Sequence, residues 1–286
     1  MKISKLSIAL ILAASMLTSC SGSDNSGSGV SSAAPAETTT SAAESSSAAD
    51  VQESSAGSEN SESGSNVVKE EMYADLSNGM PDNFEASDGW TNGSMFNVYW
   101  RAANVTFENG AMQLIIKDGD ENADGIPYSG GEFRSKDFYG YGRYEVSMKA
   151  IKNDGVVSSF FTYTGPSDNN PWDEIDIEIL GKDTTKVQFN YYTDGKGQHE
   201  YLFDLGFDAS EDFHTYAFEW HKDKIVWFVD GIEAHTATYK LPVTESKIMM
   251  NAWCGIDVDS WLNAFKADNL PLTAEYQWVK FTPFDE

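Results

Sequence analysis

The chain has 286 residues, of which 41% are hydrophobic and 13% aromatic, so it is long enough for one large domain with a sizeable core or for two small ones. Its formal net charge of −26 argues against a protein that grips nucleic acid or an anionic membrane through its charge, and the same field would repel a sulfated or uronic polymer. Neutral or cationic substrates remain.

The N-terminus has the pattern of a secretory signal. Lys2 and Lys5 precede an apolar run over residues 6–17, which is too short for a comfortable membrane span. The sequence "LTSC" that ends at Cys20 resembles a bacterial lipobox, which implies cleavage before Cys20 and lipid attachment to its thiol. The alternative is an ordinary signal peptide in which Cys20 is incidental. We therefore expect a signal peptide over residues 1–19 and a secreted protein, lipid-anchored at the bacterial cell surface or outer membrane.

The segment that follows is dominated by small and polar residues. From residue 21 to about 66 it consists of Ser, Ala, Gly, Glu and Thr, with almost no large apolar side chain. Such a segment cannot bury enough surface to offset the entropy that ordering would cost. We expect a disordered acidic tether over residues 20–72, followed by one folded domain over residues 73–286.

Short strands and turns fill the folded part. Alternation of apolar and polar residues predicts strands over residues 142–150, 186–193, 214–221, 247–253 and 274–282. Residues 224–238 predict a hairpin that turns at Asp230 and Gly231. Only two short helices are expected, near residues 208–212 and 259–265. The pattern predicts an all-β sandwich.

The stretch "PWDEIDIEILG" (171–181) carries the strongest chemical signal. On a strand its three isoleucines point to one face, and three carboxylates, Glu174, Asp176 and Glu178, point to the other. Acidic residues are poor strand formers, and like charges on one face repel. A merely solvated face is the alternative, but it would more often carry Thr, Lys or Ser. The three carboxylates therefore favour a functional site.

Two kinds of chemistry suit three carboxylates. Cα atoms four residues apart on a strand are about 13 Å apart, which makes a poor calcium or magnesium cage without loop oxygens. A retaining glycosidase needs two carboxyl groups roughly 5 to 5.5 Å apart, and Glu174 and Glu178 could approach that separation by leaning across Asp176. The charge of Asp176, or a shared proton, would then hold a neighbouring glutamate protonated. Nearby aromatic side chains could stack on sugar rings.

The stretch "WDEIDIEILGKDTTKVQFNYYTDG" resembles the active-site strand and the next strand of glycoside hydrolase family 16, and most closely the bacterial lichenases, the endo-β-1,3-1,4-glucanases. Segments such as "YGYGRYEVSMKA" and "KIMMNAW" extend the resemblance over residues 80–282. It implies a concanavalin A-like jelly-roll sandwich of two antiparallel sheets, with a glucan lying across the concave sheet. It also implies that residues 73–286 form a catalytic domain that hydrolyses mixed-linkage β-1,3-1,4-glucan with retention.

Carried over by position, the resemblance makes Glu174 the nucleophile, Glu178 the acid/base and Asp176 the helper between them. It implies that glucose units contact eleven further residues: Asn97, Glu132, Arg134, Phe161, Tyr163, Trp172, Asn190, Tyr192, Asn251, Trp253 and Trp261. Each aromatic side chain could equally pack in the core, and Arg134 could equally be the structural partner of a carboxylate. Laminarinase-type members carry an extra residue that bulges the strand between helper and acid/base, and this sequence has none.

No cofactor is required by this interpretation. Lichenases often bind a structural calcium ion through an Asp near the C-terminus, and Gln277 takes that place here, so calcium is possible but its ligand lacks a charge. Cys254 is the only free thiol if Cys20 is acylated; it is either an inert buried thiol or a nucleophile.

The expected partner is a neutral β-glucan, with no nucleic acid, with membrane contact only through the lipid anchor, and with a monomeric enzyme. Three alternatives remain open: a laminarinase-type β-1,3-glucanase of the same family, a non-catalytic glucan-binding surface protein, and a calcium-dependent adhesin.

Overall fold

The structure is a computed structural model, and it describes residues 67–120, 122 and 124–285. The expected signal peptide, Cys20 and most of the expected tether lie outside these residues. Strand pairing begins at β1 (Val67–Val68), which lies inside the range expected for the tether. This strand pairs in parallel with β8 (Phe138–Tyr139). No helix of the part that the structure describes is long and apolar enough to cross a membrane.

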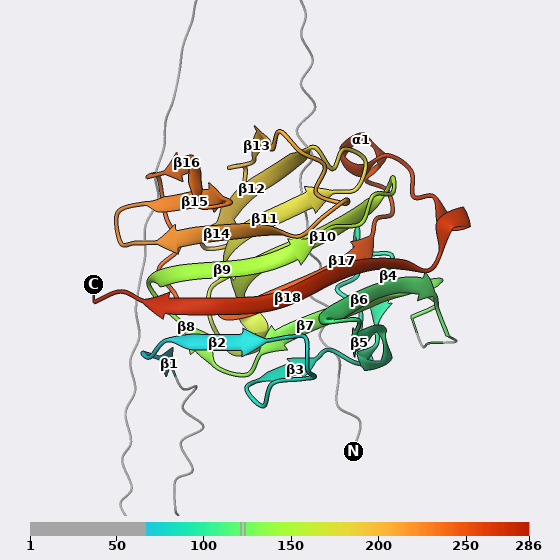
Figure 1. Cartoon of the computed structure of the whole chain (residues 1–286), viewed down its shortest axis with the longest axis horizontal. Helices are drawn as coiled ribbons and strands as arrows, with labels where there is room; N and C mark the ends of the chain where they lie inside the picture. Colours follow the sequence, from blue (N-terminus) through green and yellow to red (C-terminus); the bar gives the residue numbers. More distant parts are fainter. Residues whose placement is uncertain (1–66, 121, 123, 286) are drawn as a thin grey trace, which may run out of the picture. The chain divides into compact units, whose positions relative to one another are not determined.

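Two layers of strands make up the fold (Figure 1). The first layer is ordered β16 (Ile232–Ala237), β15 (Ile225–Val229), β14 (His214–Trp220), β9 (Gly142–Lys149), β18 (Leu272–Pro283) and β6 (Ala111–Asp118), with β2 (Met72–Asp75) on β18 and β5 (Val105–Glu108) on β6. The second layer is ordered β13 (Tyr201–Asp204), β12 (Lys186–Tyr192), β11 (Asp173–Leu180), β10 (Val156–Thr164), β17 (Lys247–Cys254) and β7 (Tyr128–Ser135), with β3 (Phe84–Ala86) and β4 (Val98–Trp100) on β7.

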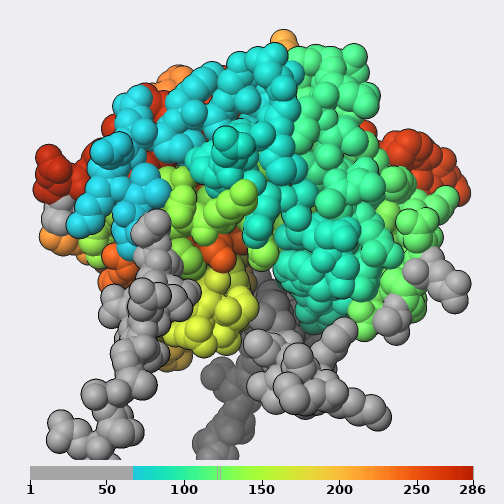
Figure 2. All heavy atoms as spheres, turned by 90° about the horizontal axis from the view of Figure 1, so that it is seen from below, coloured from blue at the N-terminus to red at the C-terminus, as the bar shows by residue number. Residues whose placement is uncertain are grey.

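The layers are joined where β6 pairs with β7, at Lys117 with Ser129 and Asp118 with Tyr128. Pairing in both layers is antiparallel, except for β4 on β7. The predicted all-β sandwich is confirmed. In the view from below (Figure 2), the segments in cyan and teal, which include β2 to β5, form much of the surface, so the N-terminal part of the described domain covers this edge of the sandwich.

The strands predicted from alternation are all present, as β9, β12, β14, β17 and β18. The predicted hairpin is β15 and β16, and it turns at Asp230 and Gly231 with φ angles of 48° and 77°. Both angles lie in the left-handed region, which a two-residue type I′ turn requires and which Asp-Gly adopts readily. Local sequence therefore determines this turn.

One of the two predicted helices is absent. Residues 208–212 form a turn because the Asp208 carboxylate accepts hydrogen bonds from Thr184 and Ser210, while the backbone of Ala209 bonds to Thr184 and Ala150. These backbone groups are then not available to a helix. The other helix, α1 (Asp259–Leu262), is shorter than expected and is followed by Asn263 at a φ of 62°. The remaining helical turns are 3-10: η1 (Ala102–Asn104), η2 (Pro166–Asp168) and η3 (Ala267–Asn269).

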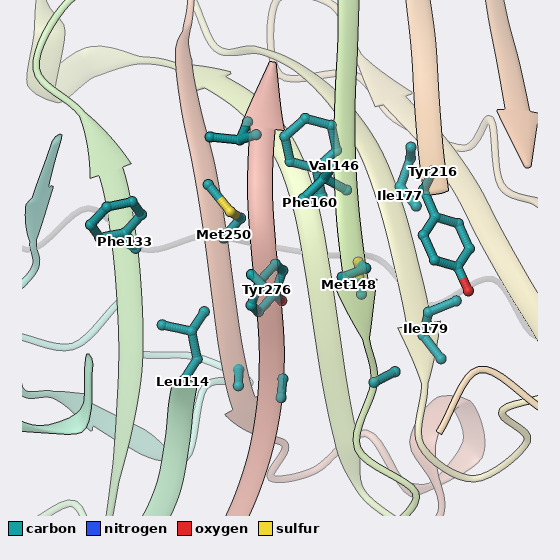
Figure 3. Packing of buried hydrophobic residues seen from close by; sticks show 14 of the residues in the cluster. Leu114, Phe133, Val146, Met148, Phe160, Ile177, Ile179, Tyr216, Met250 and Tyr276 are labelled. Atoms are coloured by element: carbon teal, nitrogen blue, oxygen red, sulfur yellow. The ribbon is translucent and has the colours of Figure 1, made fainter. Parts of the chain in front are cut away.

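The core lies between the two layers (Figure 3). Side chains of β6, β9, β14 and β18 meet those of β7, β10, β11 and β17, and the labelled examples are Leu114, Val146, Met148, Tyr216 and Tyr276 from the first layer and Phe133, Phe160, Ile177, Ile179 and Met250 from the second. The three isoleucines of β11 are fully buried, as predicted. Burial of each such side chain contributes about 1.5–3 kcal/mol. This packing holds β11 with its carboxylates on the opposite face.

Candidate active site

The three carboxylates of β11 lie on the face of the second layer that points away from the core. Neither neighbouring strand is bulged against β11, so alternation is strict, as the sequence predicts. On β10 the residues opposite Glu174, Asp176 and Glu178 are Tyr163, Phe161 and Ser159, and on β12 they are Tyr192, Asn190 and Gln188. Nine side chains from three strands therefore share one surface around the carboxylates.

Both glutamates hold their protons more tightly than a free carboxyl group does. Burial raises the pKa of Glu174 to about 7, although hydrogen bonds from Trp172 and Asp176 work against the rise. Burial likewise raises the pKa of Glu178 to about 8; a hydrogen bond from Gln188 opposes the rise, and the charges of Glu174 and Glu200 add to it. Each group therefore ionises at a higher pH than an exposed carboxyl group does.

Asp176 makes its hydrogen bond to Glu174 and not to Glu178. Burial raises the pKa of Asp176 well above its usual range, and the neighbouring charges of Glu174 and Glu178 raise it further. The hydrogen bond between Asp176 and Glu174 lowers the pKa of Glu174. Burial is the largest cause of the raised pKa of both glutamates, so the expectation that Asp176 holds a neighbouring glutamate protonated stays a prediction.

Aromatic side chains surround Glu174. The Trp172 indole N–H donates to Glu174 Oε2, and its ring stacks on Tyr192 with centroids 4.6 Å apart and planes 12° apart. Tyr163 lies across the strand pair from Glu174; burial, followed by the Glu174 charge, raises the pKa of Tyr163 to about 12, so its hydroxyl stays protonated. These three rings are only half-buried and leave surface for a ligand, whereas Phe161 is buried beside Asp176.

A hydrogen-bonded chain continues this surface toward β7. Ser159 donates to Asn251 Oδ1 at 2.6 Å, and Asn251 Nδ2 donates to Glu132 Oε2 at 3.3 Å. Ser87 donates to the other oxygen of Glu132 at 2.7 Å. Glu132 is buried, and burial raises its pKa. The structure thus places Glu132 and Asn251 together, three and two strands away from β11, and adds the two serines that sequence reasoning missed.

Arg134 has the structural partner that the sequence left open. Its Nε lies 2.9 Å from Glu85 Oε1 on β3, and the two side chains are 32% and 41% exposed. Such an exposed pair contributes at most about 1 kcal/mol. Arg134 shares the face of Glu132, so it is also positioned to meet a ligand with its remaining N–H groups.

Three of the expected residues lie around the end of β17. The Asn97 backbone N–H donates to Cys254 O, while Trp253 is only 3% exposed and packs against Phe96 and Trp261 with ring centroids 4.2 and 6.0 Å away. Most of the Trp253 side chain is therefore covered by packing, as the core-packing alternative predicts. Trp261, on α1, is half-buried and donates its indole N–H to Gln188 Oε1 at 3.2 Å.

Asn190 lies opposite Asp176 and is buried, and its side-chain oxygen accepts no hydrogen bond from the described residues. Gln188 and Glu200 were missed by sequence reasoning, although both act on Glu178. Gln188 is two residues from Asn190 on the same alternating strand. That spacing places it on the site face, but only the register places it opposite Glu178.

Few candidate ligands for a calcium or magnesium ion lie together in the described residues. Within residues 67–120, 122 and 124–285, no three His, Cys, Asp or Glu side chains gather as a metal site. Gln277, the expected calcium ligand, accepts the Ser147 hydroxyl proton at 2.9 Å through its amide oxygen. That oxygen is uncharged and is already engaged by the serine hydroxyl.

Cys254 has the properties of an inert thiol. It is fully buried, and burial raises its pKa to about 12. A thiol with so high a pKa is almost entirely protonated near neutral pH and is a poor nucleophile. The nucleophile alternative for this residue is therefore not supported.

Comparisons with known proteins agree with this geometry. Residues 92–279 match the family described as "Glycosyl hydrolases family 16". The chain is 59% identical over 214 residues to a "Xylanase/beta-glucanase" of Ruminococcus flavefaciens and 57% identical over 217 residues to a "Beta-glucanase" of Acetivibrio thermocellus, covering 73% and 76% of this chain. It spans 27% and 64% of the length of those two relatives.

A solved structure gives a closer match in length. A prokaryotic β-1,3-1,4-glucanase (lichenase) from a mouse hindgut metagenome is 52% identical with a TM-score of 0.73, and the match covers 75% of this chain and 100% of that chain. Residues 92–279, which match the family, include β11, the strand that carries the three carboxylates.

Proposed function

Because this chain belongs to glycosyl hydrolase family 16, we propose that it is a retaining endo-β-1,3-1,4-glucanase that hydrolyses mixed-linkage glucan. The observation that carries the proposal is the arrangement of Glu174, Asp176 and Glu178 on one face of an unbulged strand, with both glutamates at raised pKa. The similarity to a lichenase structure supports the substrate class.

In the first step, the protonated Glu178 gives its proton to the glycosidic oxygen while the Glu174 carboxylate attacks the anomeric carbon. The bond from that carbon to the leaving oxygen breaks, and a glycosyl ester forms on Glu174. The Trp172 N–H binds Glu174 Oε2 and favours its ionised form, which is the form that attacks.

In the second step, Glu178 acts as a base. Glu178 is ionised after giving up its proton, and it stays ionised because the charge of Glu174, which raises the pKa of Glu178, disappears when the ester forms. Glu178 takes a proton from a water molecule whose oxygen attacks the anomeric carbon, and Glu174 leaves as a carboxylate. Two inversions give net retention. All atoms and protons come from the chain, the glucan and water, so the reaction needs no cofactor.

Substrate contacts follow from the same surface. The half-buried rings of Tyr163, Trp172 and Tyr192 can stack on glucose units beside Glu174, since sugar rings present apolar faces. Glu132 and Asn251 offer hydrogen-bonding atoms farther along the face. The partner we propose is a neutral glucan, because a field set by so many carboxylates disfavours an anionic one.

Product analysis tests the substrate. We expect the purified protein to release oligosaccharides from barley β-glucan and lichenan while leaving laminarin almost intact, and Glu174→Gln to be inactive on both. Preferential hydrolysis of laminarin would instead support a β-1,3-glucanase. Binding of barley β-glucan without any release of reducing ends would support a non-catalytic module.

Azide rescue tests the roles of the two glutamates. With an activated aryl β-glucan oligosaccharide, Glu178→Ala should still form the ester on Glu174, and azide should then attack to give a β-glycosyl azide. Glu174→Ala forms no ester, so azide should enter from the opposite face and give an α-glycosyl azide. Proton NMR distinguishes the two anomers. The same anomer from both variants would mean that the roles are swapped or that the site is misread.

We also propose, from the N-terminal signal pattern and "LTSC", that the mature protein is secreted and is held at the membrane by lipid on Cys20. We propose separately that it acts as a monomer. Wild type should sediment with membranes and label with a radioactive fatty acid, and Cys20→Ala behind an ordinary signal peptide should be soluble. A fully soluble wild-type protein with an unmodified N-terminus would exclude the anchor. Light scattering on the soluble variant tests the monomer.

A further inference from the structure

Gln188 connects Glu178 to a tryptophan on α1. The residue is 5% exposed and lies directly opposite Glu178 in the pairing of β11 with β12. Its Nε2 donates to Glu178 Oε2 at 2.7 Å, and its Oε1 accepts the Trp261 indole N–H at 3.2 Å. Both ends of the Gln188 amide are thus engaged, one by the acid/base and the other by an aromatic residue from a distant part of the chain.

The indole decides which way the amide faces. An indole N–H can only donate, whereas the amide of a glutamine has a donor end and an acceptor end. Trp261 therefore requires the oxygen of Gln188 on its side, and the NH₂ group must face Glu178. Trp261 is itself held in place, because its backbone N–H donates to Val258 O and Lys182 Nζ binds its carbonyl oxygen.

The other groups facing Glu178 cannot supply this contact. From β11 the facing groups are the carboxyls of Glu174 and Asp176, and from the segment before β13 it is the carboxylate of Glu200. The facing hydroxyls are that of Ser159 on β10 and that of Tyr192 on β12. The carboxylates disfavour ionisation of Glu178, and neither hydroxyl is hydrogen-bonded to it in this geometry. Gln188 is thus the N–H donor that the structure assigns to Glu178.

We propose that Gln188 is the positioning residue of the acid/base and that Trp261 orients it. Holding Oε2 in the hydrogen bond with Gln188 leaves Oε1 of Glu178 to give and take the proton. The amide also stabilises the carboxylate that Glu178 becomes when it has given up its proton. This inference rests on the proposed function only for the role of Glu178; the chain of hydrogen bonds from Trp261 to Glu178 stands on geometry.

Direct titration of Glu178 tests the chain of hydrogen bonds without substrate. In protein labelled with ¹³C at the glutamate carboxyl carbons, the Glu178 signal is assigned by its loss in Glu178→Gln. Its chemical shift is then followed against pH to give the titration midpoint of Glu178. Loss of a donor to a carboxylate favours the protonated form. We expect Gln188→Leu to raise the midpoint by about one pH unit, the size of a hydrogen bond to a charged group. Trp261→Phe should raise it by about half a unit, since the freed amide can turn its oxygen toward Glu178.

The double variant gives the sharpest readout. If Trp261 acts through Gln188, then Gln188→Leu combined with Trp261→Phe shifts the midpoint no further than Gln188→Leu alone. Additive shifts, or no shift in Trp261→Phe, would overturn the orienting role. Trp253→Phe is the matched control, because it alters the ring next to Trp261 without touching Gln188, and its midpoint should equal that of wild type.

The same variants then connect the titration to catalysis. The basic limb of the pH profile of kcat/KM on barley β-glucan should move upward with the Glu178 midpoint, because Glu178 acts as an acid only below its pKa. An unmoved midpoint in Gln188→Leu would refute the inference while leaving the proposed function intact. If Gln188→Leu does not fold, the midpoint shift in Trp261→Phe still tests the inference, because the Trp261 side chain is only half-buried. A wild-type protein that releases nothing from barley β-glucan would refute the proposed function, and the titration would still test the hydrogen bonds.

Discussion

Asp176 lies between the two glutamates and lowers the pKa of Glu174 through their hydrogen bond. We expect Asp176→Ala to lose this bond and raise the pKa of Glu174, so the acidic limb of the pH profile of kcat/KM moves to higher pH. Asp176→Asn keeps a neutral group with an N–H donor, and its acidic limb should stay nearer that of wild type. Rates on barley β-glucan from pH 4 to 9 measure both limbs. A basic limb that moves down in Asp176→Asn would instead place the effect on Glu178.

Gly197 provides space for the ring of Tyr192. A Cβ atom at this position would lie 2.4 Å from Tyr192 Cε1, a distance that real Cβ contacts do not reach. Gly197→Ala should therefore push Tyr192 off Trp172 and raise KM for glucan several-fold, with a smaller change in kcat. Gly140→Ala is the control, since its Cβ would meet only Glu245 Cγ at 3.5 Å. Steady-state kinetics of the two variants measures both constants. Equal KM values for Gly197→Ala and Gly140→Ala would show that the stacked pair does not contact substrate.

One buried carboxylate at the start of β11 accepts hydrogen bonds from two other segments of the chain. Asp173 accepts backbone N–H groups from Asp194 at 2.9 Å through Oδ1, and from Val243 at 2.9 Å and Thr244 at 3.0 Å through Oδ2. Asp173→Ala leaves three donors without a partner, so we expect a loss of about 3 kcal/mol or more and a fall in Tm of roughly 10 °C. Calorimetry measures this fall.

A nearby aspartate serves as the control for that experiment. The Asp194 side chain is largely exposed and pairs with Lys196 at 3.5 Å. Asp194→Asn keeps a residue that tolerates the φ of 51° at this position, so Tm should change by no more than about 2 °C. Equal Tm values for Asp173→Ala and Asp194→Asn would mean that the three hydrogen bonds do not fasten these segments.

The folded domain as a whole should become less stable as the pH rises from 5 to 8. Burial raises the pKa of Glu174 to about 7 and of Glu178 to about 8, well above the ordinary value near 4.5. A carboxyl group whose pKa is raised by folding stabilises the folded state below its unfolded pKa, and this contribution is lost as the pH rises through the folded pKa. Glu174→Gln combined with Glu178→Gln should therefore melt several °C higher than wild type at pH 8, with a smaller difference at pH 5.

Melting curves of both proteins across this range test the claim, and the double variant should have no activity. This is the stability cost that a site built from buried carboxylates carries. A wild-type Tm that stays level from pH 5 to 8, or a double variant that melts lower at pH 8, would contradict the burial of both charges.

The sequence by itself determined the properties that depend on neighbours along the chain. Alternation has a period of two, so the positions of Glu174, Asp176 and Glu178 sufficed to place them on one face and the isoleucines of β11 on the other. The turn at Asp230 and Gly231 follows from two adjacent residues that tolerate positive φ. The missing bulge after Asp176 could likewise be read from spacing.

The tertiary structure alone decided what strands distant in the sequence bring together. Register placed Gln188 opposite Glu178, and the packing of α1 set Trp261 against Gln188, which spacing along either segment could not show. Tertiary contacts also made a turn of residues 208–212, because Asp208 bonds to a distant threonine. The partner of Asp176 was decided in the same way: a pKa depends on burial and on distance to other charges, and these quantities exist only once the strands have paired and packed.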